Sequence, residues 1–66
     1  MTFIEFTRIL PKNKKVKLSV NPNNIVYFQE SEEVDSEAGC MLLPVAGAEI
    51  YVAESYPDVL EKLSID

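Results

Sequence analysis

The side chains of this chain that could do chemistry fall into two charged segments of opposite sign. Five basic residues lie within the first twenty positions against one acidic residue, a local net charge of +4; they are Arg8, Lys12, Lys14, Lys15 and Lys17. Lysine and arginine clusters bind phosphate groups, so such a patch would take a nucleic-acid backbone or another anion. Positions 21–66 carry −9, which brings the whole chain to −5. Because the total is acidic, we do not expect nucleic acid to be the main partner.

The acidic segment between positions 30 and 37 holds five carboxylates, a ligand type that calcium prefers. An EF-hand loop requires acidic or amide side chains at its first, third and fifth positions, glycine at the sixth and glutamate at the twelfth. Gly39 comes too late in the segment for that pattern. We therefore predict a solvated acidic loop over residues 31–39, with no bound metal and no cofactor.

Catalytic groups are scarce in the sequence. The chain has no histidine and a single cysteine, Cys40, so it lacks both a base to activate the thiol and the ligands of a zinc site. No glycine-rich phosphate loop is present, and the paired carboxylates lie in the loop-like acidic segment, where general acid–base catalysis would lack a held geometry. We predict that the protein is not an enzyme and that Cys40 is a small apolar strand residue.

The pattern of apolar residues predicts mostly β-structure. We expect strands over residues 2–10, 15–20, 25–30, 40–45 and 49–53, with turns at 11–13 and 21–24. Pro44 cannot donate a ladder hydrogen bond, so it predicts a bulge or an early strand end. The expected fold is a single domain, 1–66, built as an antiparallel meander of four to five strands with one C-terminal helix.

That helix is predicted over residues 56–63. Ser55 is a suitable N-cap, and Asp58 follows it by three residues, as in a capping box. The apolar positions after the cap have spacings of three and four, which place them on one helical stripe: Tyr56, Val59, Leu60 and Leu63. We expect this stripe to cover one side of the sheet.

The later strands are apolar on both faces, at positions 25–28, 41–43 and 50–52. Such runs indicate burial on both sides, yet one short helix covers only one. We therefore predict a homo-oligomer; the alternatives are a sheet curled into a small barrel and an exposed patch that binds a partner. Aromatic and apolar residues of these strands are the candidates for self-association, with core packing as the other interpretation of the tyrosines: Tyr27, Phe28, Leu43 and Tyr51.

Two further expectations concern placement. In a meander, alternate loops lie at the same end of the sheet, so the lysine-rich turn and the acidic loop should meet and neutralise each other. The chain begins without a secretory pattern, has no apolar run near the ~18 residues of a membrane span, and contains a lone cysteine, so we expect a cytoplasmic protein that does not insert into membranes.

A family resemblance covers most of the chain. The segments that carry it are Phe6-Thr7-Arg8-Ile9, Leu18-Ser19-Val20-Asn21-Pro22-Asn23-Asn24-Ile25, Gly47, Val52-Ala53-Glu54-Ser55 and Val59-Leu60-Glu61-Lys62-Leu63. In this order they resemble the small FlbD-like flagellar and motility proteins, which implies a β-hairpin, a further hairpin and a closing helix. The order of segments from residue 25 to the helix is also similar to the later part of a LytTR DNA-binding domain.

These observations predict a non-enzymatic interaction or accessory protein that acts through self-association and protein–protein contacts, and the FlbD-like resemblance implies a role in motility. The alternative is a LytTR-like nucleic-acid-binding module that uses the basic hairpin from Lys12 to Lys17.

Overall fold

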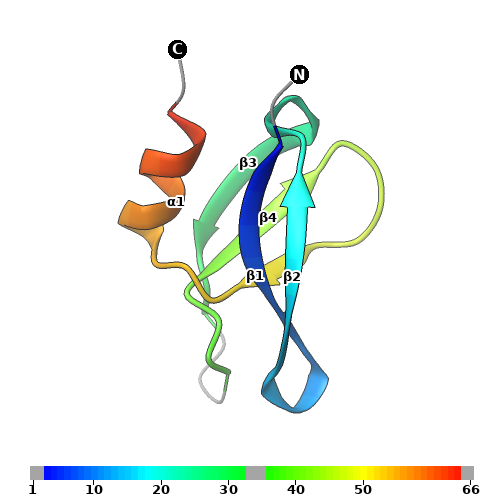
Figure 1. Ribbon diagram of the computed structural model, residues 1–66, viewed down its shortest axis with the longest axis vertical. Coiled ribbons are helices and arrows are strands. Elements are labelled where there is room, and N and C mark those ends of the chain that lie inside the picture. The colour runs from blue at the N-terminus through cyan, green and yellow to red at the C-terminus, as the bar shows by residue number, and fades with distance from the viewer. Residues whose placement is uncertain (1–2, 33–35, 65–66) are drawn as a thin grey trace.

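The computed structural model describes residues 3–32 and 36–64 (Figure 1). Within these ranges the chain forms five β-strands, two short 3-10 turns and one α-helix. In chain order the elements are β1 (Ile4–Leu10), η1 (Pro11–Asn13), β2 (Lys14–Val20), η2 (Pro22–Asn24), β3 (Ile25–Glu30), β4 (Cys40–Pro44), β5 (Ile50–Val52) and α1 (Tyr56–Leu63). Each predicted strand, turn and helix is present, with bounds that differ by at most two residues from those expected wherever the residues are described.

The five strands form one antiparallel sheet in the order β2-β1-β5-β4-β3. This confirms the expected mostly β fold with one C-terminal helix. Neighbours in sequence are neighbours in the sheet for β3, β4 and β5, but β1 pairs with β5 and so lies inside the sheet. Among the described strands, β2 and β3 are therefore the two edges, and the sheet is open. The alternative of a closed small barrel is wrong.

The β1–β2 hairpin follows the alternation that the sequence predicts. Ile4 pairs with Val20 and Phe6 pairs with Leu18, and paired residues point to the same side of the sheet. The predicted turn is η1, in which Lys12 and Asn13 have φ angles of 66° and 57°. Asparagine adopts this left-handed conformation more readily than most residues, which suits Asn13 to the end of a tight turn.

Pro44 is the last residue of β4, as the missing donor of proline predicts. The pairing of β3 with β4 shifts register between Ile25 and Tyr27, because Ile25 faces Pro44 while Tyr27 faces Leu43. Two steps along β3 thus match one step along β4, so the bulge lies on the strand opposite the proline. The expectation of a bulge or an early strand end is confirmed in both respects.

The core lies on one face of the sheet, which we call the core face. Its fully buried side chains come from three strands and the helix: Phe6, Cys40, Leu42, Val52 and Val59. Ile4, Val20 and several half-buried residues surround them. Burying one such apolar side chain stabilises the fold by about 1.5–3 kcal/mol. Since strand residues alternate between faces, Tyr27, Met41 and Tyr51 point to the opposite side, which we call the outer face.

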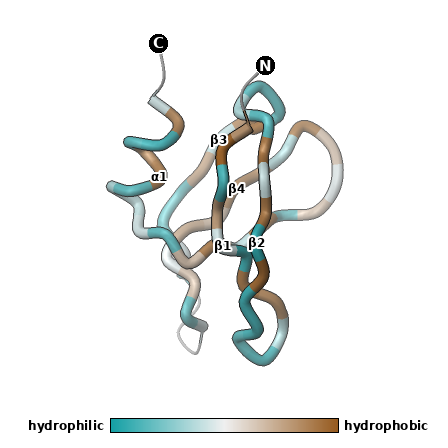
Figure 2. The backbone as a smooth tube through the Cα atoms, viewed as in Figure 1, coloured by the Kyte–Doolittle hydropathy of each residue, from teal (hydrophilic) through white to brown (hydrophobic). Residues whose placement is uncertain are grey.

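The helix begins where its cap predicts. The Ser55 hydroxyl accepts a hydrogen bond from the Asp58 N–H at 3.4 Å, and Pro57 occupies the first turn, where it removes no intrahelical bond. Hydrophobic and hydrophilic residues alternate along α1 (Figure 2). Of the predicted apolar stripe, however, Val59 alone is fully buried, while Tyr56 and Leu60 are 38% and 46% exposed. The stripe lies against one side of the sheet through Val59, and through Tyr56, whose ring packs on Phe28 of β3.

The segment before the helix fastens it to β1. Arg8 pairs with Val52, and the Ala53 N–H then donates to the Thr7 carbonyl at 2.8 Å. On the same residue, the Thr7 N–H donates to both carboxylate oxygens of Glu54, at 3.0 and 3.1 Å. The Glu54 carboxylate thus accepts the hydrogen bond from Thr7 that a backbone carbonyl of a longer β5 would accept.

Lys62 makes the second attachment, at the other end of the helix. Its Nζ donates to the Glu5 carbonyl at 3.2 Å and lies over the Phe6 ring, 5.7 Å from the centroid. A cation above an aromatic face is attracted by about 0.5–1 kcal/mol at exposed sites. The start of β1 and the end of α1 consequently lie at the same end of the molecule (Figure 1).

Replacing Glu54 by alanine is expected to lower the free energy of unfolding by about 1–3 kcal/mol, because it leaves the Thr7 N–H without its acceptor. Glu54→Gln keeps an acceptor oxygen and should lose less. Urea denaturation followed by circular dichroism measures both. The exposed Glu61 on α1 supplies the control, since Glu61→Ala should stay within about 0.5 kcal/mol of the wild type. Equal losses for the two alanine variants would contradict this role of Glu54.

Candidate functional site: the groove between β3 and α1

An apolar groove of about 410 Å³ runs between β3 and α1. Its lining contains no charged side chain and consists of Pro22, Ile25, Val26, Tyr27, Phe28, Tyr56 and Leu63. Four consecutive residues of β3 take part, and among them Tyr27 and Phe28 point to opposite faces of the sheet. A hollow that touches all four must therefore follow the free edge of β3. We call it the β3–α1 groove.

The helical wall of the groove comes from the less buried residues of the apolar stripe, of which Leu63 also packs against the core. Tyr56 and Leu63 line the groove, and Leu60 lies between them on the same side of the helix. The Tyr56 ring packs on the ring of Phe28, with centroids 5.4 Å apart. Together with Val26 and Tyr27, which are 60% and 49% exposed, these residues make a continuous apolar surface. Continuous patches of this kind mark binding sites more often than single exposed residues do.

The structure separates the four residues proposed for self-association. Tyr27 and Phe28 both line the groove. Tyr51 and Leu43 lie instead on the outer face, where Tyr27 pairs with Leu43 and Tyr51 pairs with Met41. Tyr27 therefore shares the outer face with Leu43 and Tyr51, whereas Phe28, which pairs with Leu42 of the core, points to the core face.

Sequence reasoning missed the contributions of Pro22, Ile25, Val26, Tyr56 and Leu63 to this groove. The signal for the helix residues was present, because the apolar stripe of α1 contains four residues for a helix of eight. Because the core buries only Val59 completely, the other apolar residues of the stripe can contribute to a second surface. For Val26 the signal was Pro44 in the opposite strand, which predicts a bulge, because the register shift between Ile25 and Tyr27 leaves Val26 without a partner in the pairing.

A second hollow, of about 320 Å³, lies beside the groove's strand and is polar. Glu30, Glu32 and Glu49 border it together with Met41 and Tyr51, whose hydroxyl donates to Glu49 Oε2 at 3.3 Å. Across residues 3–32 and 36–64, no three acidic, cysteine or histidine side chains come together in a way that could hold a metal ion. Glu33 and Asp35, which belong to the same acidic segment, lie outside the described residues.

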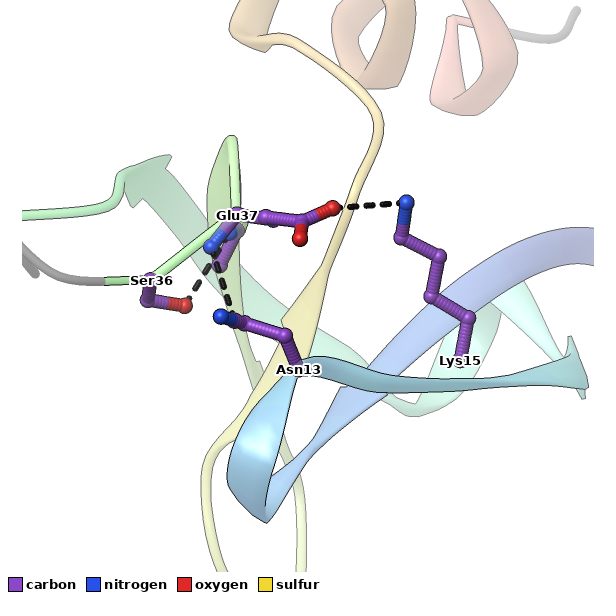
Figure 3. A network of polar contacts seen from close by, with 5 residues as sticks. Asn13, Lys15, Ser36 and Glu37 are labelled. Atoms are coloured by element: carbon purple, nitrogen blue, oxygen red, sulfur yellow. Dashed lines mark hydrogen bonds and ion pairs between the residues drawn. The ribbon is translucent and has the colours of Figure 1, made fainter.

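The lysine-rich turn and the acidic loop meet, as the sequence predicts (Figure 3). Lys15 Nζ lies 2.7 Å from Glu37 Oε1, and the Glu37 N–H donates to Asn13 Oδ1 at 3.0 Å. Both members of the ion pair are more than half exposed, so the pair adds about 0–1 kcal/mol. Its main effect is to hold the loop before β4 against the hairpin.

The five basic residues do not form a single stripe. Lys15 and Lys17 point to the outer face, whereas Arg8 and Lys14 alternate to the other side, and Lys12 lies in the η1 turn. One carboxylate, that of Glu37, already neutralises Lys15. A nucleic-acid backbone laid along either face would therefore meet fewer of these cations than the sequence cluster indicates.

Cys40 lies fully buried in β4, which confirms its place as a small apolar strand residue. Burial raises the pKa of its thiol, and the negative charges of Glu30 and Glu54 raise it further. The thiol is therefore protonated at neutral pH, when a nucleophilic cysteine would need to be a thiolate.

Among the described residues, no helix has the length and apolar character needed to cross a membrane. Residues that carry the FlbD-like resemblance make contacts that stabilise the fold: the Thr7 N–H donates a hydrogen bond to Glu54, and Ser55 caps α1. No protein-family model, curated protein or solved structure matches this chain.

Proposed function

We propose that this chain is a non-enzymatic interaction module that acts through self-association and contacts with other proteins, and that the β3–α1 groove is its binding surface. The single observation that carries the proposal is an uncharged, apolar groove along a free sheet edge. An edge strand has backbone N–H and C=O groups that an extended segment can pair with, and pockets beside it select the side chains of that segment.

The chemistry of the groove favours an extended apolar segment over a small polar ligand. Backbone pairing with β3 would align such a segment, and every second side chain would then point toward Phe28, Tyr56 and Leu63. Tyrosine and phenylalanine are enriched at protein interfaces because they contribute large contact areas. The groove thus supports recognition by shape and burial, with no group placed for bond making or breaking.

The FlbD-like resemblance supports a bacterial motility role for the module, in the cytoplasm, where a lone unpaired cysteine remains reduced. Gene neighbourhood tests this part of the proposal separately. Flagellar or chemotaxis genes next to the coding sequence would support it, and a consistent association with unrelated pathways would contradict it.

The binding surface can be tested with two matched valine variants. Val26 in the groove and Val45 outside it are 60% and 67% exposed, so arginine fits at both without disturbing the core. We expect displayed random peptides selected on the wild-type protein at low density to bind Val45→Arg equally well and to lose at least about tenfold in affinity for Val26→Arg. The selected peptides should shift the amide NMR signals of β3.

Failure to select any peptide that distinguishes Val26→Arg from Val45→Arg would contradict the groove as a binding surface. Retention on heparin or duplex DNA at low salt, lost when Lys14 and Lys17 are changed to glutamate, would instead support the LytTR-like alternative.

A further inference from the structure

We infer that the partner of the β3–α1 groove is an extended, positively charged peptide segment, in which a lysine or arginine comes one or three residues before the apolar residue that occupies the groove. This inference rests on the proposed function and specifies the chemistry of its partner. The chemistry of the surface changes along one free strand. Residues 25–28 of β3 line the apolar groove, and Gln29 and Glu30 line the polar hollow that follows it.

The polar hollow carries the charge that the groove lacks, and we call it the acidic hollow. Its carboxylates belong to Glu30, Glu32 and Glu49. Met41 and Tyr51 lie beside them and pair with each other on the outer face of the sheet. Lysine and arginine have an aliphatic stem and a charged head, so a surface that combines apolar side chains with carboxylates suits them.

The chain supplies no cation of its own to these carboxylates. The sequence has no lysine or arginine between Lys17 and Lys62, a stretch that includes β3, β4 and β5. Across residues 3–32 and 36–64, the one ion pair joins Lys15 to Glu37, and Lys15 belongs to β2 at the opposite edge of the sheet. The acidic hollow therefore attracts a basic side chain of another molecule and repels a partner that places a carboxylate there.

The backbone of β3 can pair with a partner at the boundary between the groove and the hollow. The Ser31 N–H donates to the Gly39 carbonyl at 3.2 Å, so the backbone groups of Ser31 face β4. Pairing with β4 is regular over residues 27–30. Backbone groups alternate in direction along a strand, so those of Phe28 and Glu30 face the free edge. The register shift at the start of β3 interrupts this alternation, so a partner contacts the rest of the groove through side chains.

The alternation of side chains gives the spacing within the partner. Every described pair of strands in this sheet is antiparallel, and we take the added segment as antiparallel too. Its residues opposite Gln29 and Ser31 then come one and three positions before the residue opposite Phe28. Opposite residues of an antiparallel pair point to the same side. The residue opposite Phe28 thus points to the core face, toward Tyr56, and the two earlier residues point to the outer face, toward the acidic hollow.

Peptides selected on the wild-type protein test this pattern. Those that bind Val26→Arg more weakly than Val45→Arg should be enriched in lysine or arginine one or three positions before an aromatic or aliphatic residue. Their affinity should fall about fivefold from low to high salt, because salt screens exposed charge pairs. Selected peptides that are neutral or acidic at both positions, or that place the basic residue after the apolar one, would overturn the inference.

Charge reversal on the protein places the basic residue of the peptide in the acidic hollow. Glu32→Lys and Glu49→Lys should each weaken the binding of a selected peptide about tenfold, because an attraction becomes a repulsion. Glu61→Lys makes the same change on the side of α1 away from its apolar stripe and should alter the affinity by less than about twofold. All three glutamates are exposed, and circular dichroism checks that each variant is folded.

A double-mutant cycle completes the test. Replacing the basic residue of the peptide by glutamate should weaken binding to the wild type and restore part of the binding to Glu49→Lys. If no selected peptide distinguishes Val26→Arg from Val45→Arg, the proposed function fails. If peptides that require Val26 bind Glu32→Lys, Glu49→Lys and Glu61→Lys equally well, the groove stands and the acidic hollow is not part of the interface, which would overturn this inference.

Discussion

Leu42→Ala is expected to lower the free energy of unfolding by about 2–5 kcal/mol, since Leu42 is fully buried at the centre of the core face. A domain of this length has a total stability of only about 3–10 kcal/mol, so the variant should be largely unfolded at elevated temperature. Urea denaturation followed by circular dichroism measures the loss, at protein concentrations low enough to keep the chain monomeric.

Leu60 provides a matched control for Leu42, because the same substitution removes the same atoms from a side chain that is 46% exposed. Leu60→Ala should cost less than about 1 kcal/mol in the monomer. Leu60→Ala removes contact area from the exposed stripe of α1 and leaves the core filled, so the two leucines separate folding from binding at that surface. A loss at Leu60 as large as that at Leu42 would mean that α1 is packed more deeply than its exposed stripe indicates.

Gly39→Ala should destabilise the protein by about 1–3 kcal/mol through overpacking. A Cβ atom at this position would lie 2.5 Å from the Glu54 carbonyl oxygen and 3.0 Å from that of Ala53. Both contacts are with backbone, which cannot rotate away as a flexible side chain can. Relief would require the 53–54 segment to move, and this segment carries the bond from Thr7 to Glu54.

Gly47→Ala is the control for Gly39→Ala. Gly47 has a φ of 102°, and a Cβ there would meet no atom within 4 Å, so its cost is conformational strain alone. Combining each substitution with Glu54→Ala distinguishes the mechanisms. The losses of Gly39→Ala and Glu54→Ala should be non-additive because they act on one segment, while those of Gly47→Ala and Glu54→Ala should add. Additivity in both pairs would contradict the proposed clash.

The strands and helix could be predicted from the sequence because their signals are local. The alternation of Val16, Leu18 and Val20 and the cap at Ser55 act over a few residues, and the structure has each where expected. The meeting of Lys15 with Glu37 also followed, because it required only that two turns share one end of the sheet.

The position of β1 beside β5 could not be predicted in the same way. It depends on the bond between Thr7 and Ala53 and on the Glu54 carboxylate, contacts between residues that are far apart in sequence. The spacing of apolar residues along a strand or helix does not predict such long-range contacts. A meander with β1 at an edge satisfied the same pattern of apolar residues equally well.

The candidate site was predicted in part for a related reason. Tyr27 and Phe28 were identified from an apolar run in β3, and both line the groove. The contribution of Tyr56 depended on how α1 is rotated against the sheet. Periodicity gives the apolar side of a helix, but the fraction of it that the core uses is set by packing, which leaves Tyr56 and Leu60 exposed.

The η2 turn joins strands that lie at opposite borders of the sheet, and this has a consequence for chain connectivity. Read from β3, the sheet order is β3-β4-β5-β1-β2, a cyclic rotation of the order along the chain. A circular permutant opened within residues 22–24, with a linker from the original last residue to the original first, would therefore run from each strand to its immediate neighbour. Its contacts would be more local throughout the sheet, and it should fold faster than the native arrangement.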